Sequence, residues 1–331
     1  MANKTLAKSQ DYNYATRVDK VTGSTKIGRT IRILLTIFVS LVMLIPVAWM
    51  VLTAFKSRSD AVAAPPKVFF QPTLEGFISL LTQRRQISPE QGLEALQSRT
   101  DLKWYDKLML TRGQQIIDKS QYVGYLTNSV IIAVGSTVFS VLFGVLSGYA
   151  FSRFPVKGKD DLMFFILSTR MLPAVVVTIP IFLMYRQLGL QDTRIGLILL
   201  YIVFNLSFSV WLMKGFIDEI PKEYEEAAMV DGYTRLEAFI KVVLPQAVTG
   251  IAATAIFCLI FAWNEYAFAL MLTTEKARTA PPSIPSVLGT GGIEWAAIAA
   301  GSLGFLIPVV IVTFAMRDYL LRGVTFGAVR R

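Results

Sequence analysis

Long apolar runs alternate with short polar segments along most of the chain. Six of these runs reach the roughly 20 residues that a helix needs to cross a bilayer. They lie at 31–54, 124–150, 162–187, 194–216, 247–272 and 299–320. The pattern predicts an all-α integral membrane protein with six transmembrane helices. An even number of spans places the N-terminal tail, 1–30, and the C-terminal tail, 321–331, on the same side of the membrane.

The positions of Lys and Arg predict which side that is. They gather in both tails, in the loop after the second run and in the polar stretch between the fourth and fifth runs. Short loops rich in these residues stay in the cytoplasm. We therefore expect both termini and this stretch to be cytoplasmic. The basic residues concerned are Lys4, Lys8, Arg17, Lys20, Lys26, Arg29, Arg153, Lys157, Lys159, Lys222, Arg235, Lys241, Arg322, Arg330 and Arg331.

The segment 55–123, between the first two runs, is expected outside the membrane, in the periplasm. Within it "SPEQGLEALQSR" predicts a helix with Ser88 as N-cap, Pro89 in the first turn and Gln91 completing a capping box. The following "DLKWYDKLMLTRGQQIID" has apolar residues at helical spacing. These are Leu102, Tyr105 and Met109. We expect a small helical cap, either a solvated decoration or a docking element for a partner.

Two features inside the runs bear on helix packing. "GVLSG" places Gly144 and Gly148 four residues apart in the second run, a spacing that allows another helix to approach closely. Pro173 and Pro180 in the third run predict a kink around a cavity.

The stretch "EYEEAAMVDGYTRLEAFIKVVLP", 223–245, is charged and amphipathic although apolar runs flank it. Pro221 suits the first turn of a helix, and the early Glu223, Glu225 and Glu226 suit the positive end of its dipole. Gly232 suits a left-handed C-terminal cap.

A second helix is predicted to begin at Thr234, with Glu237 completing a capping box, and to end at Pro245. Four residues at helical spacing predict one apolar face. They are Leu236, Phe239, Ile240 and Val243. The two helices make a hairpin. A linker lying on the bilayer would carry a basic face, whereas the first helix is acidic with small Ala227 and Ala228, which favours docking into a groove of a protein.

Composition narrows the function classes. Hydrophobic residues make up 53% of the chain and charged residues 17%, against about 25% charged in soluble domains. The net charge of +10 is explained by the loops, so nucleic-acid binding is not expected. The chain has no histidine, which excludes His-based catalysis and His–metal sites. The single cysteine, Cys258, lies in an apolar run and is expected to be a buried small residue.

Polar residues inside the runs are the candidates for a solute pathway. Arg170 and Glu265 either line the pathway or pair structurally, with each other or with a partner. Asn264 lies beside Glu265. For Asn128 and Asn205 an interhelical hydrogen bond is favoured, and Trp263 either stacks against a sugar ring or anchors the helix at the membrane interface.

Glu226-Ala227-Ala228, Gly232 and Val242-x-Leu244-Pro245 together resemble the EAA loop of ABC importer permeases, in which Ile is usual at the position of Val242. Three further stretches resemble the carbohydrate-uptake branch, of the maltose and glycerol-phosphate type: "GYAFSRF" (148–154), "FAWNEYAF" (261–268) and "RGVTFGAV" (322–329). The resemblance covers 121–331 well. The tract 83–118 is longer than the family usually has.

The resemblance implies a type I ABC importer permease with both termini in the cytoplasm, in a bacterial inner membrane. A five-helix core, 124–320, would carry the cytoplasmic coupling loop, 217–246. A second, similar permease would complete a heterodimer, two ATPase subunits would each receive one EAA helix, and a periplasmic binding protein would deliver a sugar, polyol or related solute.

The coupling residues would be Glu226, Ala227, Ala228, Asp231, Gly232, Leu244 and Pro245. The chain has no G-x-x-x-x-G-K-[ST] phosphate loop. We therefore expect a non-catalytic subunit that binds neither cofactor nor metal, with ATP and Mg held by the ATPase partners.

Two other classes stay open on the residues alone. A secondary transporter would show inverted repeats and use a coupling ion, but the sequence shows no repeat. A membrane enzyme would need a nucleophile or a metal cluster, and no such motif is present.

Overall fold

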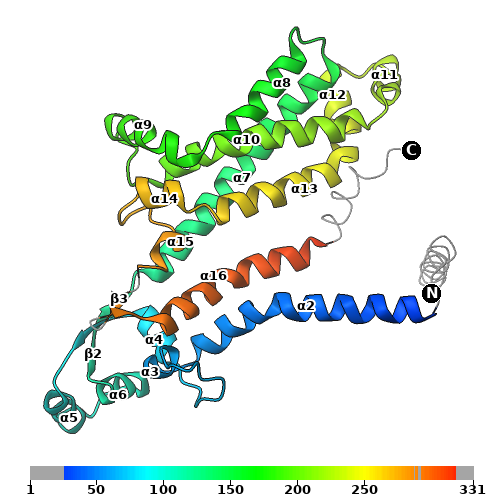
Figure 1. Ribbon diagram of the computed structural model, residues 1–331. Coiled ribbons are helices and arrows are strands. Elements are labelled where there is room, and N and C mark those ends of the chain that lie inside the picture. The colour runs from blue at the N-terminus through cyan, green and yellow to red at the C-terminus, as the bar shows by residue number, and fades with distance from the viewer. Residues whose placement is uncertain (1–25, 287, 290–291, 318–331) are drawn as a thin grey trace. The chain divides into compact units, whose positions relative to one another are not determined.

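The computed structural model describes residues 26–286, 288–289 and 292–317, most of which are helical (Figure 1). The sequence prediction of an all-α architecture is confirmed. The elements are α2 Lys26–Ala54, α3 Arg58–Ala61, α4 Glu75–Leu81, β1 Thr82–Gln86, α5 Pro89–Ser98, α6 Trp104–Thr111, β2 Gln114–Lys119, α7 Tyr122–Arg153, α8 Lys159–Ser168, the 3₁₀ turn η1 Thr169–Met171, α9 Ala174–Gln187, α10 Arg194–Asp218, α11 Lys222–Val230, α12 Arg235–Ala238, the π-helical turn η2 Phe239–Val243, α13 Leu244–Trp263, α14 Ala267–Leu272, α15 Ala280–Ser283, β3 Leu288–Gly289, β4 Gly292–Ile293 and α16 Trp295–Ala315.

The chain divides into two compact units, residues 1–53 and the remainder. The described part of the first unit is helix α2, which begins five residues before the predicted run. Its residues Gly28–Ala54 are long and apolar enough to cross a membrane. Apolar side chains are exposed along this helix, Leu34 at 61% and Met43 at 71% among them.

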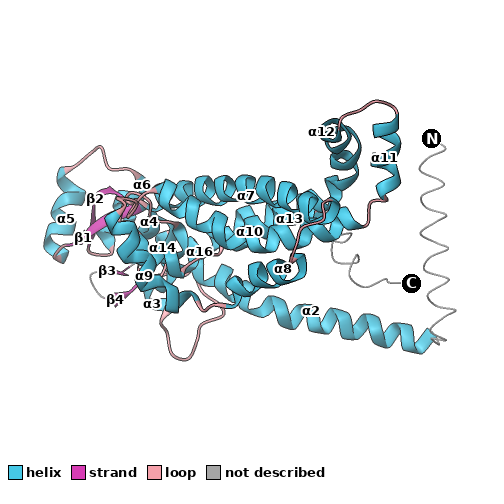
Figure 2. Ribbon diagram, turned by 90° about the horizontal axis from the view of Figure 1, so that it is seen from above, coloured by secondary structure: helices cyan, strands magenta, loops and turns pink. Residues whose placement is uncertain are grey.

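In the second unit α7, α10 and α13 pack side by side (Figures 1 and 2). The predicted close approach at Gly144 and Gly148 is confirmed. A Cβ added to Gly148 would lie 2.8 Å from the backbone N of Lys214, and one added to Gly144 would lie 2.6 Å from the Cβ of Ser209. The two glycines therefore allow α7 to contact the backbone of α10.

The third apolar run is broken. One arm spans Lys159–Met171 and the other is α9, and the angle between them is 90°. Pro173 stands at the break and is the N-cap of α9, as its lack of an N–H donor favours. The predicted kink is confirmed there, whereas Pro180 lies inside α9. Among the described residues five helices are long and apolar enough to cross a membrane, and counting the bent pair as one span brings the number to six.

The prediction of one helix over the whole fifth run is wrong. The fifth run, 247–272, is not one helix, because α13 ends at Trp263 and α14 begins at Ala267. The carboxylate of Glu265 accepts the N–H groups of Phe268 and Ala269 and so starts the new helix. The sixth run corresponds to α16, Trp295–Ala315, and the last residues of the predicted run, 318–320, lie outside the described residues.

The segment between α2 and α7 contains the predicted helix α5, with both hydrogen bonds of the Ser88–Gln91 capping box. Helix α6 is present as well, and it is accompanied by strands that the sequence did not predict, of which β1 pairs antiparallel with β2. The polar sequence of β1, TQRRQ, lacks the alternation that would have predicted a strand. Arg84 of β1 forms a buried ion pair with Glu294, 2.6 Å long, which anchors the pair of strands at the start of α16.

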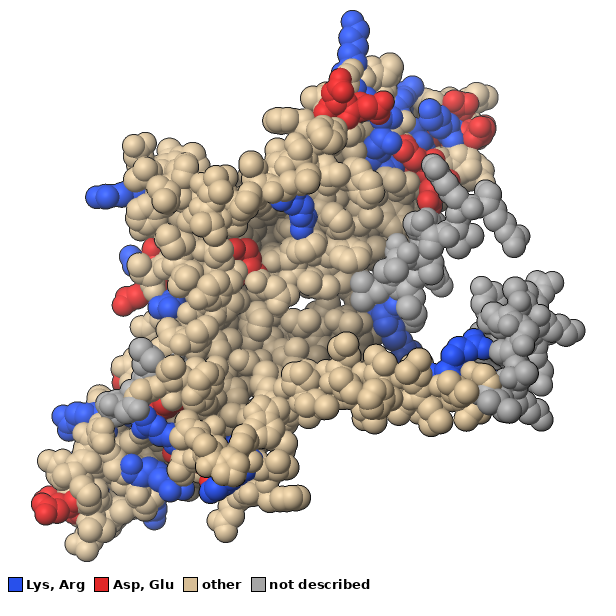
Figure 3. All heavy atoms as spheres, viewed as in Figure 1, with Lys and Arg blue, Asp and Glu red and all other residues tan. Residues whose placement is uncertain are grey.

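Charged side chains gather over α11 and α12 at one end of this unit and over the α5–α6 region at the other, with a mostly uncharged zone between (Figure 3). This distribution suits a protein that crosses a membrane. The cytoplasmic assignment of the termini stays a prediction. Residues 1–25 and 318–331, with the motif at 322–329, lie outside the described residues.

Candidate coupling hairpin and solute pocket

The hairpin of α11 and α12 carries the predicted caps. Gly232 has a φ of 92°, in the left-handed region, directly after the C-cap residue Asp231. Thr234 and Glu237 form both hydrogen bonds of the capping box. Pro221 is the N-cap of α11 rather than a first-turn residue.

The prediction that Pro245 ends the second helix is wrong. Residues Arg235–Trp263 form one continuous helix that is long and apolar enough to cross a membrane. Pro245 lies in the first turn of α13, where a missing N–H is tolerated, and the wider π-helical turn η2 precedes it. The predicted apolar face is only partly covered. Phe239 and Val243 are buried, whereas Leu236 and Ile240 are 65% and 51% exposed.

Most predicted coupling residues face outward. Glu226, Ala227, Asp231, Gly232 and Pro245 are exposed. Two are not: Ala228 is buried, and Leu244 packs partly buried against the core. Apolar side chains are exposed beside them, namely Tyr224, Val230, Tyr233, Leu236 and Ile240. The hairpin therefore presents a mixed acidic and apolar surface outside the packed helices.

Sequence reasoning missed how the hairpin is held. Glu225, interpreted as a residue favoured by the helix dipole, is instead buried and paired with Arg153 at the end of α7. Tyr149 donates to the same carboxylate, over 2.9 Å. In the sequence Arg153 is a topology marker and part of the motif at 148–154, and neither feature indicates which carboxylate it meets.

A pocket of about 320 Å³ lies at the break of the third span, between α9, α10, α13 and α14. It brings together three of the six candidate pathway residues, Arg170, Asn205 and Glu265. Trp263, Asn264 and Asn128 do not line it. The lining residues are Arg170, Leu172, Ala174, Tyr201, Phe204, Asn205, Phe261, Ala262, Glu265 and Phe268.

Arg170 lies against aromatic rings. Its Cζ is 4.0 Å from the ring centroid of Phe261 and 5.1 Å from that of Phe208, which makes cation–π contacts. Within the described residues its Nη1 has no hydrogen-bond partner, and no ion pair joins it to Glu265. The alternative that these two residues pair with each other is therefore not realised in this structure.

Glu265 has a structural role besides lining the pocket. Its carboxylate accepts from the hydroxyl of Tyr201 at 2.7 Å as well as from the backbone of α14. Asn264 is exposed and donates only locally, to the carbonyl of Ile260. Trp263 is buried, and its indole stacks on Phe305 with ring centroids 5.0 Å apart. The pathway role of these three residues stays a prediction.

The favoured interpretation of the two asparagines is confirmed. Asn128 of α7 accepts from Arg194 at the start of α10 at 2.7 Å, and Asn205 of α10 donates to the carbonyl of Cys258 in α13 at 3.2 Å. Cys258 is fully buried, as predicted.

Asp192, just before α10, is a second residue that sequence reasoning missed. Its carboxylate accepts five hydrogen bonds from Thr274–Ala277, in the loop after α14. Burial alone would raise the pKa of Asp192, but the N–H groups of Ala277, Lys276 and Thr274 outweigh it and lower the pKa to about 2. Asp192 therefore fastens this loop as an anion.

Residues 140–326 match the family described as "Binding-protein-dependent transport system inner membrane component". The chain belongs to this family. The matched residues include the hairpin and the pocket at the break.

Relatives agree with the family. The chain is 30% identical over 311 residues to the probable ABC transporter permease protein y4oR of Sinorhizobium fredii (strain NGR234), covering 93% of this chain and 99% of the relative. It is 28% identical to the trehalose/maltose transport system permease protein MalG of Thermococcus litoralis, covering 91% and 97%. The predicted resemblance to carbohydrate-uptake ABC permeases is confirmed.

A solved structure confirms the permease fold. It is that of a bacterial ABC transporter involved in the import of the acidic polysaccharide alginate. The match has 24% sequence identity and a TM-score of 0.62, and it covers 92% of this chain and 98% of that chain.

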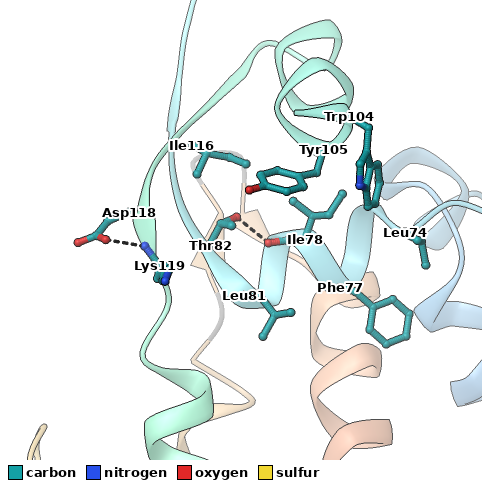
Figure 4. Close-up of a pocket in the computed structure, with 10 residues that line it drawn as sticks. All are labelled: Leu74, Phe77, Ile78, Leu81, Thr82, Trp104, Tyr105, Ile116, Asp118 and Lys119. Carbon is teal, nitrogen blue, oxygen red and sulfur yellow. Dashed lines mark hydrogen bonds between the residues drawn. The ribbon is translucent and has the colours of Figure 1, made fainter. Parts of the chain in front are cut away.

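The segment between α2 and α7 lies before the matched family region and carries a pocket of about 500 Å³ (Figure 4). Aromatic and aliphatic side chains line it, with Trp104 and Tyr105 of α6 opposite Phe77 and Ile78 of α4. Asp118 and Lys119 of β2 lie at one side. A docking role for this segment stays a prediction.

Proposed function

We propose that this chain is one of two permease subunits of an ABC importer in a bacterial inner membrane. A periplasmic binding protein delivers a sugar, polyol or related solute, and two ATPase subunits drive its passage. The chain itself is non-catalytic and binds no cofactor, because ATP and Mg are held by the ATPases.

The observation that carries the proposal is the surface of the hairpin. Glu226 and Ala227 are exposed, and Val230, at 88% exposure, lies one turn further along the same helix. An exposed acid beside exposed apolar side chains suits a groove that is apolar at its centre and basic at its rim. The ATPase subunit is proposed to supply that groove.

The pocket at the break is proposed as part of the solute path. A solute rich in hydroxyl groups loses hydrogen bonds to water on entering the membrane, and each one left unmade costs about 1–3 kcal/mol. Arg170 offers donors, and Phe204 and Phe261 offer ring faces beside it. The relative named for trehalose and maltose supports a saccharide as the solute class.

The test is reconstitution in liposomes of this chain with a second permease, the ATPase and a binding protein. We expect saccharide uptake that requires both ATP and the binding protein. Uptake driven by an ion gradient without the ATPase would refute the proposal and support a secondary transporter.

A further inference from the structure

The coupling helix α11 is fastened to α7 by a buried ion pair. The side chains of Glu225 and Arg153 are 6% and 4% exposed. The Oε1 of Glu225 accepts from the Nε of Arg153, and its Oε2 accepts from the hydroxyl of Tyr149 at 2.9 Å. Both oxygens of the carboxylate are therefore used by residues of one helix, one turn apart.

The guanidinium of Arg153 joins three segments. Besides Glu225 of α11, its Nη2 donates to the carbonyl of Ile220, in the link between α10 and α11, at 2.8 Å. Its Nη1 donates to Ser152 of its own helix at 3.0 Å. A planar fork with several fixed donors holds its partners in one orientation, which a single ammonium would not do.

Tyr149 contacts both arms of the hairpin. Its hydroxyl reaches Glu225 on α11, and its ring packs on Phe239 of η2 with centroids 4.4 Å apart. The link is reinforced by Ser152, which donates to Asp218 at the end of α10 at 2.6 Å. The hairpin is consequently held as a unit on α7 and α10.

Adjacent glutamates on α11 point in opposite directions. Glu225 is buried against α7, whereas Glu226 is exposed and makes no hydrogen bond or ion pair within the described part of the chain. A close-packed buried contact does not deform freely, so the position of Glu225 suits it to pass a displacement of α11 on to α7.

We propose that Arg153 and Tyr149 are positioning residues of the coupling hairpin, which transmit displacement of α11 to α7 through Glu225. The inference rests on the proposed function, since it needs an ATPase that moves α11. Neither residue lines the pocket at the break, and both are proposed to act through the position of the hairpin.

The test compares Arg153→Gln and Tyr149→Phe with Lys157→Gln, an exposed charge removed just after α7. Assembled complexes are reconstituted with ATPase and binding protein, and solute imported per ATP hydrolysed is measured. Arg153→Gln is expected to lower this ratio roughly fivefold or more, the low end of coupling between distant sites. Tyr149→Phe, which keeps the ring on Phe239, is expected to lower it less, and Lys157→Gln is expected to match the unmodified complex.

A ratio that is unchanged in both variants, with or without a loss of assembled complex, would overturn the inference and show that the ion pair only stabilises the fold. If the proposed function itself is wrong, the unmodified complex shows no uptake that depends on ATP and the binding protein, which separates this failure from failure of the inference.

Discussion

The contact between α7 and α10 depends on the missing side chain of Gly148. A Cβ at this position would lie 2.8 Å from the backbone N of Lys214 and 3.1 Å from the carbonyl carbon of Met213. Carbon atoms in good contact are about 3.5–4.0 Å apart. The two helices would have to separate, because the obstructing atoms belong to the backbone and cannot rotate away.

Overpacking of this kind costs about 1–3 kcal/mol, and Ala regains up to ~1 kcal/mol over Gly in helix propensity. Gly148→Ala is therefore expected to destabilise by about 0–2 kcal/mol, and the bulkier Gly148→Val by about 3 kcal/mol, at the upper end of the overpacking range. The matched control is Gly124→Ala on the same helix, where an added Cβ meets nothing within 4 Å.

The assay is the free energy of unfolding in lipid bicelles, measured for each variant against the unmodified chain. Gly124→Ala is expected to be neutral or mildly stabilising. Equal effects of Gly124→Ala and Gly148→Val would refute the packing argument.

Three further predictions concern topology, the pocket and the loop at Asp192. A reporter fused near residue 95 is expected to be periplasmic and one near residue 230 cytoplasmic; the same side for both would contradict the six-span arrangement. Glu265→Gln places an amide where backbone N–H groups now donate, and an unmatched buried donor costs about 1–3 kcal/mol, so less complex is expected to assemble. The control, Asn264→Ala at an exposed position, is expected to leave assembly unchanged. Normal assembly of Glu265→Gln would contradict the capping role. The pKa of Asp192 is lowered from 3.8 to about 2, so the stability that its anion provides is present above pH 3.8 and lost as the pH falls toward about 2. Asp192→Asn, which tolerates the same positive φ, is expected to lower the unfolding temperature at pH 7 and to remove this acid-dependent loss of stability. An acid transition that is unchanged in Asp192→Asn would contradict this role of Asp192.

Apolar run length, caps and glycine spacing made the fold predictable to a large extent. Gly232, Thr234 and the Gly144–Gly148 pair act locally or through a simple spacing, so their roles follow from a few neighbouring residues. Run length alone, however, cannot show that Glu265 starts a separate helix within the fifth run, because that depends on a side chain folding back on the next turn.

The site was predictable only in part, because its key contacts join residues far apart in the chain. Glu225 and Arg153 are 72 positions apart, and Asp192 lies more than 80 positions from its donors. One sequence indicates which residue types are present but not which of them meet. For Trp263 the residue type leaves a ring platform and an interfacial anchor open, and it does not indicate the stacking on Phe305 that the structure shows.

The central claim is that α11 docks an ATPase through its exposed face. It is tested most directly by the dissociation constant between the ATPase and the permease pair, measured for Glu226→Lys and for Asp160→Lys, which makes the same charge change at an exposed position on α8. The account predicts that Glu226→Lys weakens binding about tenfold or more, because like charges then meet at the groove, while Asp160→Lys binds normally. Unchanged affinity for Glu226→Lys would contradict it.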